Sequence, residues 1–508
     1  MSNFDKTAVQ TFRFVRCSLD ADSGVARLVY AFDDGPELTE TVTFPGAPFA
    51  LPPARAQAAE RALRLLHLIT GVSYYKAAVP PRIVIDDYAI DAETAVLLEQ
   101  IYTHGLGEFA YRNGLDLHGK IRFPASKPSP SRGGLGGDGV PVGRAKSVLA
   151  GSEDHPHPSP SGPAQRAGRS DDPRGSAAQT GHPHSLEGEG AKLDLRNHAL
   201  VAIGGGKDSL VSIEALRGAG VEQTVCWIGG SQLIAACAAR TGLPTLNIGR
   251  ALAPELFDYN RQGAWNGHIP VTAINSAILA LAALLYDADQ VVFSNERSAS
   301  YGSMIPGTGE VNHQWSKGWA FERAFGEHLQ RHVVADLNYY SLLRPLSELA
   351  VARQFARTDR YDAHFSSCNR NFHILGERPV NRWCGVCPKC HFVFLALAPF
   401  MPKPRLVGIF GRNLLDDPAQ AAGFDALLEY QDHKPFECVG EGRESRAAMA
   451  ALGDRPEWQE DALVTRFNRE IRPQLDAGEL VIAPLLELHG EHRVPAALWE
   501  RLRANFAA

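Results

Sequence analysis

The chain has 508 residues, 44% hydrophobic and 21% charged, an ordinary globular composition that can bury a sizeable core. Its formal net charge of -6 leaves no large basic field for a nucleic-acid backbone, so we expect no nucleic-acid partner. The first residues form neither a basic nor an apolar leader, and polar residues interrupt the most apolar stretch (269–286), so we expect a cytoplasmic protein without a membrane span.

Residues 1–124 are predicted to form an N-terminal α+β domain with its own core. Three runs of alternating apolar and polar residues, 11–17, 25–32 and 38–44, are separated by turn-type sequence. This pattern favours a small antiparallel sheet. Residues 55–69 then space their apolar side chains as an amphipathic helix does.

Residues 125–197 have a different composition, rich in Gly, Pro, Ser and His and without an aromatic residue. Such a segment cannot bury enough apolar surface to offset the entropy lost on ordering. We therefore predict a disordered linker between two folded parts.

Residues 198–400 are predicted to form an α/β domain built on a doubly wound parallel sheet. Short apolar runs at 199–203, 224–228 and 244–248 are separated by helical segments, which is typical of parallel βαβ units. After this domain, residues 401–508 have the pattern of charged amphipathic helices, so we expect a mostly helical C-terminal region.

A glycine-rich loop follows the first strand of the predicted α/β domain. It consists of Gly204, Gly205, Gly206, Lys207, Asp208 and Ser209. Backbone N–H groups at such a strand–helix junction, together with the helix N-terminus, suit a polyanion. The loop is neither a Walker A motif, because Asp208 stands where Ser or Thr is needed, nor G-x-G-x-x-G. A structural glycine turn is the alternative.

The loop resembles the PP-loop of the N-type ATP pyrophosphatases, whose pattern is Ser-Gly-Gly-x-Asp-Ser, with Gly204 in place of the leading Ser. The resemblance implies a fold of the adenine nucleotide α-hydrolase-like type, in which the loop holds the pyrophosphate of ATP while a substrate oxygen attacks the α-phosphorus. The products would be an adenylated intermediate and pyrophosphate. Asp208 is then assigned to Mg²⁺ or to ordering the loop, and Ser209 to a phosphate oxygen. Lys207 occupies the variable position.

The same resemblance implies a site for the adenine and ribose. They would lie over the ends of the neighbouring strands, near Trp227, Asn295 and Glu296, where open α/β sheets bind ligands.

Four of the eight cysteines crowd together, as Cys368, Cys384, Cys387 and Cys390. Four thiolates favour a tetrahedral, structural Zn²⁺. A [4Fe–4S] cluster is the competitor, but Phe394 stands where the bacterial motif has its fourth cysteine. Reduced, metal-free cysteines are the other alternative. A comparable zinc knuckle follows the PP-loop domain of 7-cyano-7-deazaguanine synthase, so the loop and the cysteines support each other.

Six sequence blocks, in this order, closely resemble the UDP-N-acetylmuramoyl-L-alanyl-L-glutamate epimerase (MurL) family. They are GGGKDSLVSIEALRGAG, WNGHIPVTAINSAI, SNERSAS, VNHQWSKGWAFE, CNRNFH with WCGVCPKCHFVFLAL, and KPFECVGEGRES. The resemblance covers nearly the whole chain outside 126–197. It implies an isomerase of peptidoglycan synthesis that converts the terminal L-Glu of a UDP-muramoyl dipeptide to D-Glu, using ATP and Mg²⁺ and releasing AMP and diphosphate.

The implied chemistry has a physical reason. Removing the Cα proton beside an ionised carboxylate accumulates negative charge, whereas adenylation makes the carboxylate a neutral anhydride and acidifies Cα. Because the Glu nitrogen is already acylated by Ala, ring closure to an oxazolone is a second route to loss of configuration.

The proton carriers are predicted from loop-like surroundings. His268, His313 and Cys438 each lie in a polar, glycine-adjacent stretch and could shuttle a proton, with a structural role as the alternative for each. Cations that could pair with the carboxylates or phosphates of the substrate are Arg297, Lys317 and Arg323.

Two other classes of function stay open from the sequence. One is a different PP-loop adenylating enzyme, such as an amide- or nitrile-forming synthase of nucleoside metabolism. The other is a non-catalytic nucleotide-binding scaffold, in which ATP binds but no pyrophosphate forms.

Overall fold

The computed structural model of the chain describes residues 4–126, 190–305, 309–371, 379, 381–431 and 434–507. Most of the predicted linker (127–189) lies outside these residues, so its disorder stays a prediction. The strands are β1 (Thr11–Asp20), β2 (Val25–Phe32), β3 (Leu38–Thr43), β4 (Arg82–Ile85), β5 (Ala199–Ala202), β6 (Gln223–Ile228), β7 (Thr245–Ala251), β8 (Gln290–Phe293), β9 (Ser303–Ile305), β10 (Gly309–Val311) and β11 (Asn338–Ser341).

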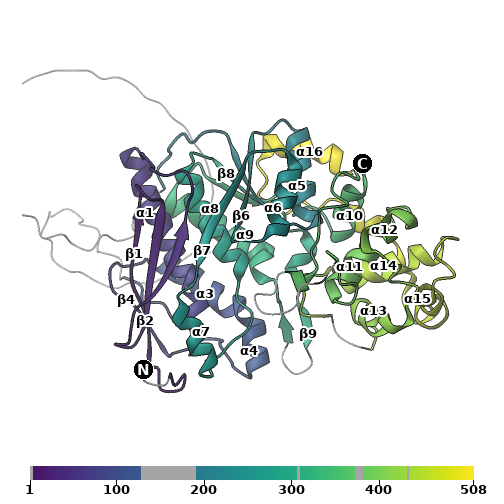
Figure 1. Cartoon of the computed structure of the whole chain (residues 1–508), viewed down its shortest axis with the longest axis horizontal. Coiled ribbons are helices and arrows are strands. Elements are labelled where there is room, and N and C mark those ends of the chain that lie inside the picture. The colour runs from purple at the N-terminus through teal and green to yellow at the C-terminus, as the bar shows by residue number, and fades with distance from the viewer. Residues whose placement is uncertain are drawn as a thin grey trace, which may run out of the picture.

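The α-helices cover both faces of the part of the sheet that β5, β6 and β8 form, and they make up most of the C-terminal part (Figure 1). They are α1 (Pro53–Thr70), α2 (Val72–Tyr75), α3 (Ala92–Gly105), α4 (Gly107–Asn113), α5 (Lys207–Gly218), α6 (Gln232–Thr241), α7 (Pro254–Arg261), α8 (Val271–Leu285), α9 (Trp319–His328), α10 (Glu348–Ala356), α11 (Pro388–Leu397), α12 (Lys403–Phe410), α13 (Ala421–Leu428), α14 (Gly442–Gly453), α15 (Ala462–Arg466) and α16 (Ala496–Ala507).

One nine-stranded sheet has the order β11-β8-β5-β6-β7-β3-β2-β1-β4. The five strands from β11 to β7 are parallel, as the alternation of apolar runs and helices predicts. Strands β1, β2 and β3 are antiparallel, as their alternating pattern predicts. The prediction of a mixed α/β fold with a largely parallel sheet is therefore confirmed, and the assignment to the PP-loop type stays a prediction.

The N-terminal strands continue the parallel sheet and do not form a sheet of their own. Strand β3 pairs antiparallel with β7, with Thr41 opposite Ala251 and Thr43 opposite Gly249. The N-terminal segment shares one hydrophobic core with α8 and with one face of the parallel strands. The predicted separate core is thus replaced by a shared one. Pairing with β3 covers the edge of β7, which would otherwise expose unpaired backbone groups.

Helix α8 lies at the centre of this shared core. Twelve of its fifteen residues are buried, and it packs along α1. It occupies most of the apolar stretch 269–286. No helix among the described residues has the length and hydropathy that a membrane span needs.

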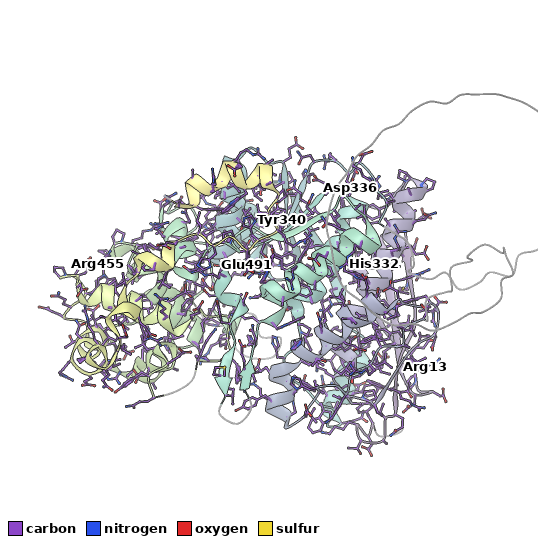
Figure 2. All side chains as sticks on the ribbon, turned by 180° about the vertical axis from the view of Figure 1, so that it is seen from behind. Arg13, His332, Asp336, Tyr340, Arg455 and Glu491 are labelled. Atoms are coloured by element: carbon purple, nitrogen blue, oxygen red, sulfur yellow. The ribbon has the colours of Figure 1, made fainter. Side chains whose placement is uncertain are left out.

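The opposite face of the parallel strands carries a second core, formed with α5, α10, α11 and the helices that follow. In the described parts of 401–508 the regular elements are helices, as predicted. Helix α16 returns to the sheet domain, where Arg501 donates to the carbonyl of Ala219 and Gln354 donates to that of Asn505. Arg13 and Arg455 mark opposite ends of the molecule (Figure 2).

The last residues of the predicted linker, 190–197, belong to the folded part. The backbone N–H groups of Leu193 and Leu195 donate to the carboxylate of Asp336, at 3.0 and 3.2 Å. Ala191 forms a bridge with Val334. The linker therefore ends earlier than its composition indicates, because a few backbone hydrogen bonds suffice to hold a segment without aromatic residues.

Candidate functional site

The topology of the parallel strands creates a crevice at their carboxyl ends. From β5 the chain continues to β6 and β7 on one side, and then returns to β8 and β11 on the other side of β5. The connection that leaves β5 and the connection that leaves β8 therefore run in opposite directions. Open α/β sheets bind ligands in the crevice between two such connections. The glycine-rich loop follows β5, and Asn295 and Glu296 follow β8.

The glycine-rich loop is shaped for a close approach by a ligand. Gly205 has φ +83°, in the left-handed region that favours glycine, and an added Cβ there would lie 3.0 Å from the side chain of Leu233. An added Cβ at Gly204 would meet no atom within 4 Å, so the absent serine of the PP-loop pattern has room. The hydroxyl of Ser209, at the start of α5, donates to the carbonyl of Gly206 at 3.3 Å.

Lys207 is a structural cation of the loop and is only 2% exposed. Its Nζ forms ion pairs with the carboxylates of Asp208 and Glu348. Burial opposes the charge of Lys207, but the two carboxylates outweigh burial and raise its pKa. Lys207 therefore fixes the loop to the start of α10, where sequence reasoning finds no functional signal.

Three carboxylates, those of Asp208, Glu296 and Glu348, interact electrostatically at this end of the crevice. Burial and the neighbouring carboxylates raise the pKa of Glu348 to about 7. Burial and Asp208 raise that of Glu296. Burial would raise the pKa of Asp208 as well, but Lys207 and Lys389 hold it below its usual range. Clustered carboxylate oxygens fit a Mg²⁺ ion, which prefers oxygen ligands.

The residues predicted beside the nucleotide lie around the same crevice. Trp227 is near the end of β6 and is 8% exposed; its buried indole N–H has no partner among the residues that the structure describes. The amide of Asn295 donates to the hydroxyl of Ser341 at 3.0 Å. Arg344 donates to the backbone carbonyls of Glu296 and Lys317, and so ties these two positions together.

A second group of side chains comes from four separate parts of the chain. It contains Glu108 on α4, His268 before α8, His313 after β10 and Cys438 before α14, and we call it the proton-transfer cluster. The imidazole rings of His268 and His313 lie 4.2 Å apart, and Glu108 pairs with Nδ1 of His313. Lys317 Nζ donates to the sulfur of Cys438 at 3.0 Å.

The charges in the cluster are set by its neighbours. Burial would raise the pKa of the Cys438 thiol, but Lys317 and His313 outweigh burial and hold it well below its usual range. Burial would lower the pKa of His313, yet hydrogen bonds with Cys438 and Glu108 raise it to about 9. Burial and the adjacent His313 lower the pKa of His268 to about 4. These shifts favour the thiolate form of Cys438, the imidazolium form of His313 and the neutral form of His268.

The glycine-rich loop (residues 204–209), which we call the phosphate loop after its predicted role, and the proton-transfer cluster form one continuous site. Lys317 and Lys389 lower the pKa of both Asp208 and Cys438. Lys389 also donates to the backbone carbonyl of Cys438. The three sequence-predicted proton carriers thus lie together, within electrostatic reach of the phosphate loop.

The four clustered cysteines converge as the spacing predicts. The Sγ atoms of Cys384 and Cys390 are 3.7 Å apart, those of Cys368 and Cys387 are 3.9 Å apart, and those of Cys387 and Cys390 are 3.5 Å apart. A tetrahedral zinc with Zn–S bonds of about 2.3 Å holds its sulfurs about 3.8 Å apart. The four sulfurs therefore fit a structural zinc ion.

The segment that carries Cys368 contacts the phosphate loop. The N–H of Ser366, two residues before Cys368, donates to the carbonyl of Gly205 at 2.9 Å. Asn369, which follows Cys368, donates to the carboxylate of Glu437. A metal bound to Cys368 would thus hold residues 366–369 against both the phosphate loop and the segment that carries Cys438.

Two of the predicted substrate-pairing cations lie outside this site. Arg297 donates to the backbone carbonyl of Glu487, and Arg323 is exposed on α9. Sequence reasoning missed Glu108, Glu348, Arg344 and Lys389. Lys389 lies between two of the cysteines and so could have been noticed. Glu108, Glu348 and Arg344 carry no local signal, because only the tertiary structure brings them to the site.

Comparison with known proteins gives consistent matches over almost the whole chain. Residues 3–138 and 171–342 match the family model of the MurL N-terminal domain, and residues 364–480 match that of the MurL C-terminal domain. A relative from Xanthomonas oryzae pv. oryzae is 69% identical over 100% of both chains. A relative from Micromonospora is 39% identical over 97% of this chain and 98% of its own. Both relatives are named UDP-N-acetyl-alpha-D-muramoyl-L-alanyl-L-glutamate epimerase.

Proposed function

The chain belongs to the MurL family, and from this premise we propose that it epimerises the terminal L-Glu of UDP-N-acetylmuramoyl-L-alanyl-L-glutamate to D-Glu in an ATP-dependent reaction. As a member of this family it is an epimerase, and so an isomerase. The observation that carries the proposal is the grouping of Cys438, whose sulfur lies 3.0 Å from Lys317 Nζ, with His313 and Glu108 close to the phosphate loop. An epimerase that activates a carboxylate needs proton-transferring groups and a phosphate-binding loop in one site.

The first step is activation of the glutamate α-carboxylate. One carboxylate oxygen attacks the α-phosphorus of ATP, the bond to the bridging oxygen breaks, and diphosphate leaves. The N–H groups of Gly205 and Gly206 and the start of α5 stabilise the phosphates. Lys207 holds the loop in this shape through its pairs with Asp208 and Glu348. Activation removes the negative charge that otherwise opposes loss of the Cα proton.

Magnesium completes the phosphate end of the site. Asp208, with Glu296 next to it, would hold the ion, which neutralises charge on the phosphates when bound. Burial and, after it, the neighbouring carboxylate of Asp208 raise the pKa of Glu296.

The second step is inversion at Cα. On the direct route, the Cys438 thiolate accepts the Cα proton of the adenylated substrate and leaves an enolate, the imidazolium of His313 returns a proton to Cα, and hydrolysis of the anhydride releases AMP and the epimer. On the oxazolone route, the alanyl amide oxygen first attacks the activated carbonyl and AMP leaves. The same two side chains then exchange the Cα proton of the ring, and water opens the ring to give the epimer. Acid and base are separate side chains with oppositely shifted pKa values, which is the arrangement that general acid–base catalysis requires. Lys317 keeps the thiolate charged, and His268 and Glu108 orient His313.

Zinc in the four-cysteine site has a structural role in this scheme. It would join residues 366–369 to the segment 384–390, behind the phosphate loop. Metal binding energy at such a site is folding energy.

The proposal is tested by incubating the protein with Mg²⁺, ATP and the UDP-muramoyl dipeptide. We expect D-Glu after hydrolysis and chiral analysis, with AMP and diphosphate formed alongside. Diphosphate formation that depends on a different acceptor, without D-Glu, would support another adenylating enzyme. ATP binding without any diphosphate would support a scaffold. Either outcome contradicts the proposed function.

A further inference from the structure

Three hollows lie in a row between helices α3 and α9, and we call them together the α3/α9 groove. Their volumes are about 760, 440 and 390 Å³. The first and second share the lining residues His104, Trp315 and Ala320, and the second and third share Gln100, Ala324 and Glu327. Each volume is within the range of small-molecule sites. A continuous groove of this kind suits an elongated ligand.

The largest hollow opens beside the proton-transfer cluster. Gly107 and Asn312 line it, and they immediately precede Glu108 and His313 in the chain. A ligand whose reacting end lies at the cluster can therefore extend its other end into the groove.

The wall of the largest hollow is aromatic with a few polar groups. Tyr111, Trp315 and Trp319 line it, and the ring of His104 stacks on Trp315 with centroids 5.2 Å apart. Burial lowers the pKa of His104, so its imidazole is neutral and can both donate and accept hydrogen bonds. Flat apolar rings with scattered hydrogen-bonding groups suit a sugar ring that carries an acetamido group.

The middle hollow contains an unpaired cation. Arg323 lines it and is exposed, and among the described residues its guanidinium has no hydrogen bond and no ion pair. Arg331, which lines the third hollow, is different because it pairs with Glu93 and Glu327. A free guanidinium with five donors suits a phosphate group.

The third hollow offers an apolar surface. Val96, on α3, lines it and is 54% exposed, next to Leu97 and Ala324. His332, in the turn that follows α9, contacts the carboxylates of Asp91 and Glu93 at the start of α3. The groove thus has a fixed end that can receive a planar base.

We propose that the α3/α9 groove binds the nucleotide–sugar part of the substrate, with the muramoyl sugar in the largest hollow, the diphosphate on Arg323 and the uracil over Val96. This assignment rests on the proposed function and deepens it. The dipeptide then extends from the sugar towards the proton-transfer cluster, where Gly107 and Asn312 of the largest hollow adjoin Glu108 and His313 in the chain. From Ala320 to Glu327 the α9 wall is about 10 Å long, which allows the sugar and the diphosphate to occupy successive hollows.

The test uses UDP-N-acetylmuramic acid, which lacks the dipeptide and so cannot be epimerised. Its binding to the full-length protein is measured by isothermal titration calorimetry. Replacing Arg323→Ala should weaken binding about tenfold or more, because a charge-assisted phosphate contact is lost. Replacing Ala320→Phe, on the exposed wall shared by two hollows, should weaken it by obstruction. The control Arg27→Ala removes an exposed arginine of β2 that lines none of the hollows, and it should bind like the wild type.

A second readout separates the groove from the reacting end. In Arg323→Ala, the ratio of kcat/KM for the full substrate to that for N-acetyl-L-alanyl-L-glutamate should fall about tenfold. Binding that is equally tight in both groove variants and the wild type would overturn the assignment, and so would an equal loss in Arg27→Ala. A wild-type protein that epimerises its substrate without binding UDP-N-acetylmuramic acid would overturn it as well. Binding without epimerisation would overturn the proposed function and support the groove.

Discussion

The phosphate loop and the proton-transfer cluster are built in opposite ways. The loop is six consecutive residues, 204–209, at a strand–helix junction. The cluster takes Glu108, His268, His313 and Cys438 from parts of the chain that are up to 330 positions apart. The chain itself brings the six loop residues together, and Glu348 then holds the loop in shape through Lys207. The cluster, in contrast, assembles only when α4 and the segment before α14 are packed against the sheet domain.

This difference has consequences for chemistry. At the loop, buried Lys207 pairs with both Asp208 and Glu348, so these charges hold the loop in a fixed shape. At the cluster, Cys438 and His313 have pKa values shifted in opposite directions, so the charges are ready to move a proton. The contact of Tyr111 with Phe436, with ring centroids 5.5 Å apart, packs α4 against the segment that carries Cys438. Changes at the two ends should therefore have separable effects.

The largest expected effect is at the cluster. Cys438→Ala should slow epimerisation about 10³-fold, because the base that accepts the Cα proton is lost. ATP-dependent diphosphate formation should persist for at least one turnover, as measured in a single-turnover assay. The matched control Cys17→Ala removes a half-buried cysteine of β1 and should leave both activities intact. Normal epimerisation by Cys438→Ala would exclude the thiolate as the base.

A smaller but broader effect is expected at the loop. Asp208→Ala should reduce diphosphate release about 10²-fold, a loss of about 3 kcal/mol of transition-state stabilisation. Epimerisation should fall in parallel, because activation precedes proton loss. Both rates are followed in one reaction, with Glu222→Ala, a surface carboxylate before β6, as the control. A loss of epimerisation alone would contradict the order of the two steps.

Loss of metal from the four-cysteine site should impair both the phosphate loop and the proton-transfer cluster, because it lowers the stability of the fold. Cys387→Ser should release the metal and lower Tm by about 5 °C or more, because metal binding stabilises the fold. Zinc content by elemental analysis and Tm by calorimetry should fall together, while Cys17→Ser changes neither. Iron and visible absorption in the purified wild type would contradict the zinc assignment.

The smallest expected effect concerns Glu108, a positioning residue that acts through His313. With the pKa of His313 raised to about 9, wild-type kcat/KM should fall as the pH rises through about 9 and the imidazolium loses its proton. Glu108→Gln removes one of the charges that raise this pKa, so the alkaline limb should move to lower pH. At pH 7 the loss should stay below about tenfold. An unchanged pH profile would exclude this role.

The local parts of the molecule were predictable from sequence, and the assembled parts were not. The strand runs, the buried helix α8, the loop after β5 and the four-cysteine site each follow from residues close in the chain. The pairing of β3 with β7 does not, because an edge strand carries no signal for its partner. The sequence identified His268, His313 and Cys438 individually as candidate proton carriers. Their convergence on Glu108 depends on α4, whose sequence reads as an ordinary helix.

The central claim is that activation at the phosphate loop precedes proton loss at the cluster. The most direct test is incorporation of deuterium at the Glu Cα of the UDP-muramoyl dipeptide in D₂O, measured by mass spectrometry with the wild-type protein. We expect incorporation with ATP and Mg²⁺, and none without ATP or with an ATP analogue whose α–β bridge is a methylene group. Deuterium at Cα in the absence of ATP would contradict the claim.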